Sequence, residues 1–283
     1  MADTLTHTGD LTDDLLYGAL SPDGSTLYAF ELNRGFDIRS YAFPALTGGS
    51  VILNDVTGPM ACDGDGVLYW VDDALNEAET LAATQIWKNA GSPTLVWSSA
   101  FANPNPTVTL CWSPYDGLLY ALIDGLLYSI DPTSGADTLL YTPSVGTPTI
   151  ASGPVPTLDG GIWWSFSPSS SSHKVIRYDI PGSSGAEAIV GITHYQDQLL
   201  PRADGTAVGF TSSGSSAFIV ASDLSATSAP DLAGIVGGAR GVAYTPDLSL
   251  VVFGSRGTNG VWQIGEVVVP TYHFTIGRVG FHG

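Results

Sequence analysis

The sequence predicts an all-β protein, a six-bladed β-propeller of four-stranded antiparallel blades, and three observations lead to this prediction. A short acidic turn followed by an apolar, often aromatic strand recurs six times along the 283 residues. Measured between the turn aspartates, the steps are 42, 51, 43, 45 and 43 residues, which is the length of a four-stranded blade. Gly and Pro are frequent and Lys is nearly absent, as expected for short strands joined by turns.

Each repeat is marked by an anchor, a turn with an aspartate that precedes a strand. The anchors are Ser21-Pro22-Asp23-Gly24, Asp65-Gly66, Ser113-Pro114-Tyr115-Asp116-Gly117, Asp159-Gly160, Asp204-Gly205 and Pro246-Asp247. Aspartate side chains in such turns bond the nearby backbone, so the formal net charge of −18 is expected to arise largely from turn chemistry. Within a repeat, we expect the innermost strand before the anchor and the other three strands after it.

The third and fourth repeats show this order most clearly. The third divides into strands over 108–114, 118–123, 125–131 and 138–142. The fourth continues after its anchor with strands over 162–166, 173–179 and 186–191. The second repeat is longer, because residues 72–79 insert an acidic stretch that is expected to form a loop or a single helical turn.

Closure of the ring has two candidate strands. Residues 3–8 alternate and could supply the outermost strand of the last blade, and residues 266–269 could supply it from the other end. The propeller is therefore expected over 1–269. The remaining tail, 270–283, alternates apolar residues, contains no acidic residue and has no obvious use in six blades.

At the anchors and third strands, the chain resembles the propeller repeats of the YVTN and NHL classes. Ser21-Pro22-Asp23-Gly24 before Leu27-Tyr28 matches their first turn and strand, and Ile130-Asp131 with the turn at 132–135 matches the later one. This resemblance implies a fold and not an activity, because such repeats occur in enzymes, receptors and assembly proteins alike. The small-residue, Lys-poor composition also resembles minor tail or virion proteins of phages with actinobacterial hosts.

Composition argues against two classes of partner. Only nine Lys and Arg oppose 27 acidic residues, so the chain lacks the basic stripe that nucleic-acid binding needs. No apolar stretch is long enough for a membrane span, and Met1-Ala2-Asp3-Thr4 does not begin a secretory signal. We expect synthesis in the cytoplasm without a signal peptide and, if the phage resemblance holds, a place in the virion.

The channel mouth is the place to search for chemistry, since it holds the site in propeller enzymes that resemble gluconolactonases and strictosidine synthase. Counting back from the anchors predicts the inner positions Leu16-Tyr17, Gly58-Pro59, Thr109-Leu110, Ser152-Gly153, Asp197-Gln198 and Arg240-Gly241. Only Asp197 offers a carboxylate, whereas a hard divalent cation needs about six oxygen ligands, so we predict no metal and no cofactor. Asp197 and Arg240 are expected to form an ion pair between blades, or with Tyr17 a small polar-ligand site.

Other catalytic signatures are missing from the sequence. No nucleophile elbow and no phosphate-binding loop occurs, so no catalytic residue is assigned. Cys62 and Cys111 occupy similar places in consecutive repeats, where buried free thiols are favoured over a disulfide. The seven tryptophans are expected mainly between blades, with adjacent Trp163 and Trp164 facing opposite sides, and a carbohydrate platform is the alternative.

Two functions follow from these features. The first is a non-enzymatic interaction module in a larger assembly, a phage tail or virion, that engages a partner protein or a host surface glycan. Its contact would be the tail, through Tyr272, Phe274, Ile276, Val279 and Phe281. The second is a propeller enzyme or a lectin whose site lies at the channel mouth near Tyr17, Asp197 and Arg240.

Overall fold

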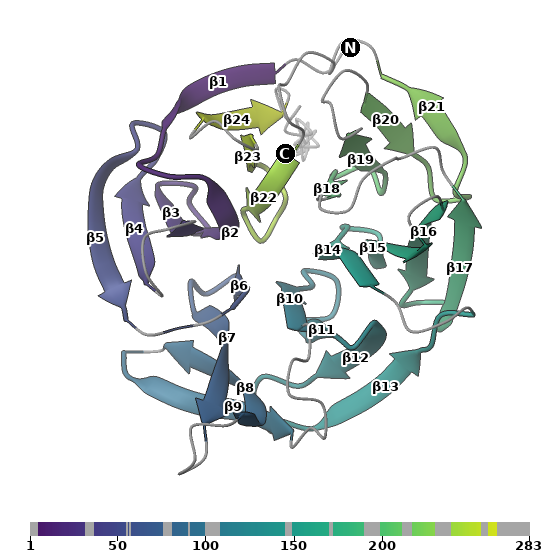
Figure 1. Ribbon diagram of the computed structural model, residues 1–283, viewed down its shortest axis with the longest axis horizontal. Helices are drawn as coiled ribbons and strands as arrows, with labels where there is room; N and C mark the ends of the chain where they lie inside the picture. The colour runs from purple at the N-terminus through teal and green to yellow at the C-terminus, as the bar shows by residue number, and fades with distance from the viewer. Residues whose placement is uncertain are drawn as a thin grey trace, which may run out of the picture.

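The chain forms a ring of six sheets around a central axis (Figure 1). The computed structural model describes residues 5–31, 37–54, 56, 58–75, 81–89, 91–99, 108–144, 149–169, 172–189, 199–210, 217–229, 239–255 and 260–264. Every regular element in these ranges is a β-strand, and each sheet has four strands. The predicted all-β, six-bladed propeller is confirmed. None of the described segments is a helix long and apolar enough to cross a membrane.

The first three blades follow one another along the chain, each from its inner to its outer strand. Blade 1 contains β2 (Leu15–Leu20), β3 (Thr26–Glu31), β4 (Ile38–Ala42) and β5 (Thr47–Leu53). Blade 2 contains β6 (Met60–Cys62), β7 (Leu68–Leu75), β8 (Leu81–Asn89) and β9 (Pro93–Ser99). Blade 3 contains β10 (Val108–Trp112), β11 (Leu119–Ile123), β12 (Leu126–Ile130) and β13 (Asp137–Tyr141), close to the predicted bounds.

The next two blades repeat this order, and the sixth differs in its outer strand. Blade 4 contains β14 (Thr149–Pro156), β15 (Gly161–Ser169), β16 (Ser172–Asp179) and β17 (Ser184–Ile189). Blade 5 contains β18 (Leu200–Pro201), β19 (Ala207–Phe210), β20 (Ala217–Val220) and β21 (Ala226–Ser228). Blade 6 contains β22 (Ala239–Tyr244), β23 (Val251–Ser255), β24 (Gly260–Ile264) and β1 (Leu5–Asp10).

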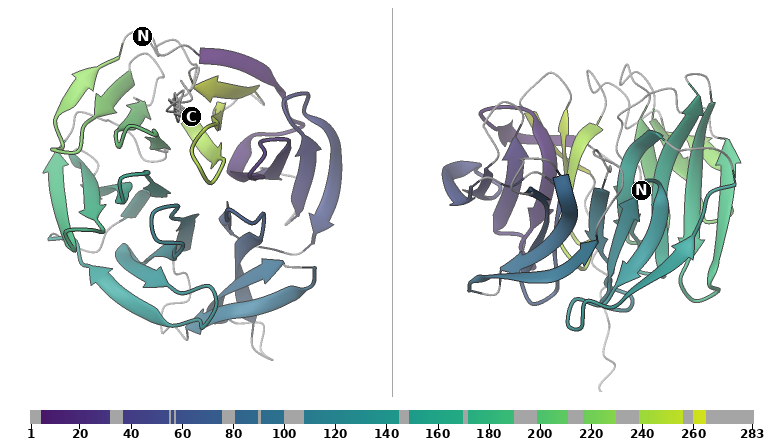
Figure 2. Two further views of the ribbon diagram at one scale, coloured as in Figure 1. Left: turned by 180° about the vertical axis from the view of Figure 1, so that it is seen from behind. Right: turned by 60° about the horizontal axis from the view of Figure 1, so that its bottom comes forward.

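The ring is closed by the N-terminal strand. β1 pairs antiparallel with β24, from Leu5 opposite Ile264 to Asp10 opposite Gly260. The strand joins the two ends of the described chain in one sheet, as Figure 2 shows from behind. All six blades are therefore complete without residues 265–283, and the alternative closing strand, 266–269, lies outside the described residues.

The expected loop in the second repeat is partly wrong. Residues 72–75 continue β7 and pair with β8, with Asp72 opposite Gln85 and Asp73 opposite Thr84. The ladder satisfies their backbone groups, which favours strand over loop despite the acidic side chains. The inserted residues thus lengthen a hairpin, and the rest of the insertion, 76–80, lies outside the described residues.

Most anchor aspartates bond their own turns, and at the second anchor the Asp63 carboxylate does so in place of Asp65. The Asp23 carboxylate accepts hydrogen bonds from the Ser21 hydroxyl at 2.6 Å and the Ser25 N–H at 3.0 Å. The bond from Ser21, with those from Ser25, lowers the pKa of Asp23 to about 2. In the third anchor, Asp116 accepts from the Tyr120 hydroxyl at 2.7 Å. Much of the acidic charge therefore serves local turn structure, as the sequence predicts.

The hydrophobic core lies between the blades. The buried side chains form six clusters, and each cluster joins two adjacent blades. Trp163 packs toward blade 5 and Trp164 toward blade 3, and both are almost completely buried. This confirms that the two rings face opposite sides of β15.

Candidate functional site

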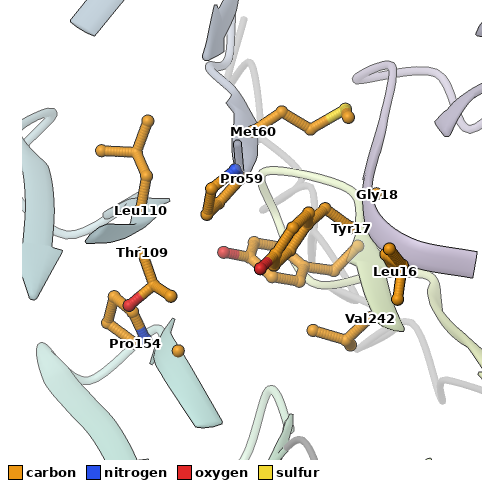
Figure 3. A pocket seen from close by; sticks show the side chains of 11 residues that line it. Leu16, Tyr17, Gly18, Pro59, Met60, Thr109, Leu110, Pro154 and Val242 are labelled. Atoms are coloured by element: carbon orange, nitrogen blue, oxygen red, sulfur yellow. The ribbon is translucent and has the colours of Figure 1, made fainter. Parts of the chain in front are cut away.

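The inner strands surround a small pocket on the propeller axis (Figure 3). Five blades contribute to its wall, which is lined by Leu16, Tyr17, Gly18, Pro59, Met60, Thr109, Leu110, Gly153, Pro154, Val242 and Tyr244. Six of these positions are among the inner positions predicted from the anchors. The repeat register alone therefore located most of the pocket.

The side chains that line the pocket are apolar except for three hydroxyl groups. They belong to Tyr17 on β2, Thr109 on β10 and Tyr244 on β22. Figure 3 shows Tyr17 on one side of the pocket, with Thr109 and Pro154 on the other. Burial raises the pKa of Tyr244 well above its usual value, so this phenol is neutral at physiological pH. The pocket thus offers uncharged hydrogen-bonding groups in an apolar wall.

Thr109 is the most unusual of the three. Its side chain is buried, with 7% of the residue exposed, and its hydroxyl has no hydrogen-bond partner within the described part of the chain. A buried hydroxyl without a partner carries a desolvation cost. The pocket volume is about 30 Å³, which is room for about two water molecules.

Tyr244 was missed in the sequence because it lies next to its anchor rather than six or seven residues before it. The signal that could have identified it is alternation along β22. Val242 and Tyr244 are two residues apart, so they project to the same side of the strand and both line the pocket.

The predicted pair of Asp197 and Arg240 is not tested by the described part of the structure. Asp197 lies outside the described residues. Arg240 is in β22, one residue before Gly241, but its side chain is outside the described part of the structure. The ion pair and the ligand site at Tyr17, Asp197 and Arg240 therefore stay predictions. Among the described side chains, no group of three or more His, Cys, Asp or Glu is arranged to hold a metal.

The two cysteines are free and buried, as expected. Burial, with a smaller effect of the neighbouring Asp63 carboxylate, raises the pKa of Cys62 to about 12. Burial also raises the pKa of Cys111 well above its usual value. Both remain thiols at neutral pH, so neither is an activated nucleophile.

No tryptophan forms an exposed platform. All seven tryptophans are buried or half-buried, and the most buried lie between blades. The carbohydrate platform considered from the sequence therefore gains no support from the exposure of these side chains.

The rim of the disc is the second candidate surface. We define the rim as the outermost strands β1, β5, β9, β13, β17 and β21, which form the periphery in Figure 1. Exposed aliphatic side chains occur on four of them: Val51 and Ile52 on β5, Leu95 on β9, Leu139 on β13 and Ile189 on β17. Ile189 is the most exposed, at 71%.

Both lysines of the chain are engaged in contacts within the molecule. Lys88 Nζ donates to the carbonyl of Pro132 at 2.9 Å, which links blade 2 to blade 3. Lys174 Nζ lies 2.9 Å from a carboxylate oxygen of Glu187. The rim therefore lacks the free lysines that commonly protect strand edges from pairing with other chains.

The C-terminal tail, residues 270–283, is the remaining candidate contact surface from the sequence. Its proposed contact residues, Tyr272, Phe274, Ile276, Val279 and Phe281, all lie outside the described residues. Their role as a partner-binding strand stays a prediction.

Comparison with known proteins identifies the fold and leaves the activity open. No family model matches the chain, and no curated protein matches it. Among solved structures, a gluconolactonase from Xanthomonas campestris aligns with a TM-score of 0.64 and 12% identity, over 92% of this chain and 89% of the other. A streptogramin B lyase aligns with a TM-score of 0.58 and 12% identity, over 93% and 97%.

A third match is TolB from Acinetobacter baumannii, with a TM-score of 0.56 and 16% identity, over 80% of this chain and 56% of TolB. A protein of unknown function from Bacteroides thetaiotaomicron also aligns, with a TM-score of 0.59 and 12% identity, over 93% of this chain and 76% of the other. At these identities the likeness is one of fold. The matched proteins differ in function, so none of their activities is transferred to this chain.

Proposed function

We propose that this chain is a non-enzymatic structural or interaction β-propeller that is part of a larger assembly. The observation that carries the proposal is the set of exposed apolar side chains on the rim. Aliphatic side chains are exposed on the outermost strands of four consecutive blades, and both lysines are engaged elsewhere. Surfaces with unpaired strand edges and exposed apolar side chains are typical of sites that contact another protein.

The partner and the assembly are the finer parts of this proposal. We propose a protein partner, with the tail residues Tyr272, Phe274 and Ile276 as one contact. The placement in a phage tail or virion rests on composition alone, and none of the solved structures named above supports it. A host surface glycan is the alternative partner.

Co-sedimentation tests the proposal. Material from the source would be fractionated by size, and the position of the full chain would be compared with that of a chain without residues 270–283. We expect the full chain to travel with large particles and the shortened chain to travel less with them. If both remain at the size of a monomer, the proposal is wrong.

A second candidate is a small-ligand binder at the channel pocket. It is favoured by one observation, the buried Thr109 hydroxyl without a partner in the pocket wall. A ligand that binds only the folded protein raises its melting temperature. A thermal-shift screen with divalent metals, lactones and glycans therefore tests this function, and a response lost in Thr109→Val would assign the ligand to this pocket.

A further inference from the structure

We propose that β17 is the docking edge of this propeller and that it accepts the C-terminal segment 270–283 of a second copy as a fifth strand of blade 4. This proposal deepens the proposed function, on which it rests, by naming the surface and the partner. It follows from a comparison of the six rim strands and from the completeness of the blades.

Five of the six rim strands carry a feature that discourages pairing with another strand. The ladders that hold β1, β5, β9 and β13 each contain a register shift. Such bulges twist an edge away from a flat partner. β21 has only three residues. Very short edge strands are likewise poor templates.

β17 has neither protection. It pairs with β16 over six consecutive residues, from Ser184 opposite Asp179 to Ile189 opposite Lys174, without a register shift. Its outer edge makes no backbone hydrogen bond within the described part of the molecule. A regular edge of this length is a template for an added strand, because its outward N–H and C=O groups lack protein partners.

The single charge of β17 is turned away from solvent. Glu187 is the only charged residue in the strand, and its side chain is 10% exposed. It is paired with Lys174 and bonded to Tyr141 and Ser144 of blade 3. Because these partners already satisfy the carboxylate, an added strand would not have to bury an unpaired charge.

The other side chains of β17 leave room for a strand with large side chains. They are Ser184, Gly185, Ala186, Ala188 and the exposed Ile189. Large residues of an added strand would pack beside these small ones as cross-strand neighbours.

The segment after residue 269 has the complementary composition. Tyr272, Phe274 and Ile276 alternate with smaller or polar residues, as in a strand with one apolar face. The segment contains Arg278 and no acidic residue, so the strongly acidic disc does not repel it. Since β1 already supplies the fourth strand of blade 6, the described strands complete every blade without this segment.

The contact joins different surfaces of the two copies, an edge from one and a tail from the other. Such a head-to-tail contact can propagate into rings or filaments. It also has a distinctive test, because a copy with a blocked edge and a copy with a blocked tail should still bind each other.

The experiment uses full-length variants in sedimentation velocity at high micromolar concentration. Ala186→Lys places a charge on the β17 edge, and Phe274→Lys places one in the tail. The matched control is Ala226→Lys, which makes the same change at an exposed position of the β21 edge. Circular dichroism and melting temperature would verify that each variant is folded.

We expect the wild type and Ala226→Lys to self-associate, and the other two variants to associate at least about tenfold more weakly. A mixture of Ala186→Lys and Phe274→Lys should form a complex of one copy of each, because one intact edge meets one intact tail. A monomeric wild type, an Ala186→Lys variant that associates like the wild type, or a mixture without a complex would overturn the proposal. Co-sedimentation of the purified wild type with particles from the source separates the two proposals. If the wild type is monomeric in sedimentation velocity but still travels with the particles, the interaction function stands and the partner is not a second copy.

Discussion

Glu187 on β17 accepts a hydrogen bond from the hydroxyl of Tyr141 on β13 at 2.8 Å, and this contact ties blade 4 to blade 3. The same carboxylate accepts bonds from the N–H and the hydroxyl of Ser144, each at 2.7 Å, and pairs with Lys174 at 2.9 Å. Burial by itself raises the pKa of Glu187, but these donors outweigh it and lower the pKa to about 2. Tyr141, Ser144, Lys174 and Glu187 thus form a polar cluster between blades 3 and 4.

Removing the negative charge of Glu187 should destabilise the propeller, and the loss of stability should depend on pH. At pH 7, we expect Glu187→Gln to lower the free energy of unfolding by about 1 to 3 kcal/mol, because Lys174 loses its partner. The pKa of Glu187 falls from 4.5 to about 2 in the folded protein, so the stabilisation is present above about pH 4.5 and is lost as the pH falls toward 2. Denaturant unfolding across this range measures it. A difference between wild type and variant that does not shrink with falling pH would contradict the assignment.

Because the buried hydroxyl of Thr109 has no partner in the described structure, its removal should not lower the stability of the protein. Thr109→Val removes a buried hydroxyl that has no partner in the described structure, so it should leave stability unchanged or raise it by up to about 1 kcal/mol. The matched control is Thr157→Val. The Thr157 hydroxyl donates to Asp159 at 2.5 Å and accepts from the Gly161 N–H at 3.0 Å, so its loss should cost about 1 to 3 kcal/mol. A clear destabilisation by Thr109→Val in thermal unfolding would mean that a bound molecule satisfies the hydroxyl.

Ring closure by β1 predicts unequal roles for the two ends of the chain. The Thr8 hydroxyl donates to the Val261 carbonyl at 2.9 Å, and the His7 ring lies 5.0 Å from that of Trp262. Removal of residues 1–10 exposes the edge of β24 and should lower Tm by about 10 °C or more. Removal of residues 265–283 leaves every described strand in place and should leave the Tm of the monomer unchanged. Scanning calorimetry compares the two, and equal losses would rule out β1 as the closing strand.

Blades 6 and 1 approach so closely at Gly241 that one added methyl group there should destabilise the protein. A Cβ at Gly241 would lie 2.5 Å from the carbonyl oxygen of Leu15, and backbone atoms cannot move aside easily. We expect Gly241→Ala to cost about 1 to 3 kcal/mol in urea unfolding. Gly64→Ala is the control, because the nearest atom there belongs to Trp112 at an ordinary 3.6 Å. Similar stabilities for the two variants would show that the blades separate readily.

The repeat register was predictable because each turn and strand is coded locally. The Asp116 turn and the Tyr120 strand after it are set by neighbours in sequence, and the structure joins them by a hydrogen bond. The same register predicted that Tyr17 and Thr109 would lie near the axis. Both residues line the channel pocket.

Contacts between blades could not be read in the same way. Tyr141 and Glu187 are 46 residues apart, and no local pattern marks them as partners. Whether Asp72 and Asp73 form a loop or a strand also depended on β8 lying beside them, since the backbone of this stretch pairs with Gln85 and Thr84 of β8.

The spacing of the anchors and the alternation of the strands were enough to predict a six-bladed propeller, because both are local properties that repeat. The folded ring shows in addition that β1 closes it, that Lys174 neutralises Glu187 and that β17, among the described rim strands, is the long one without a bulge. These features depend on which strands meet across a ladder or between blades. These contacts are set by how the whole ring packs, so the sequence of a single repeat does not predict them.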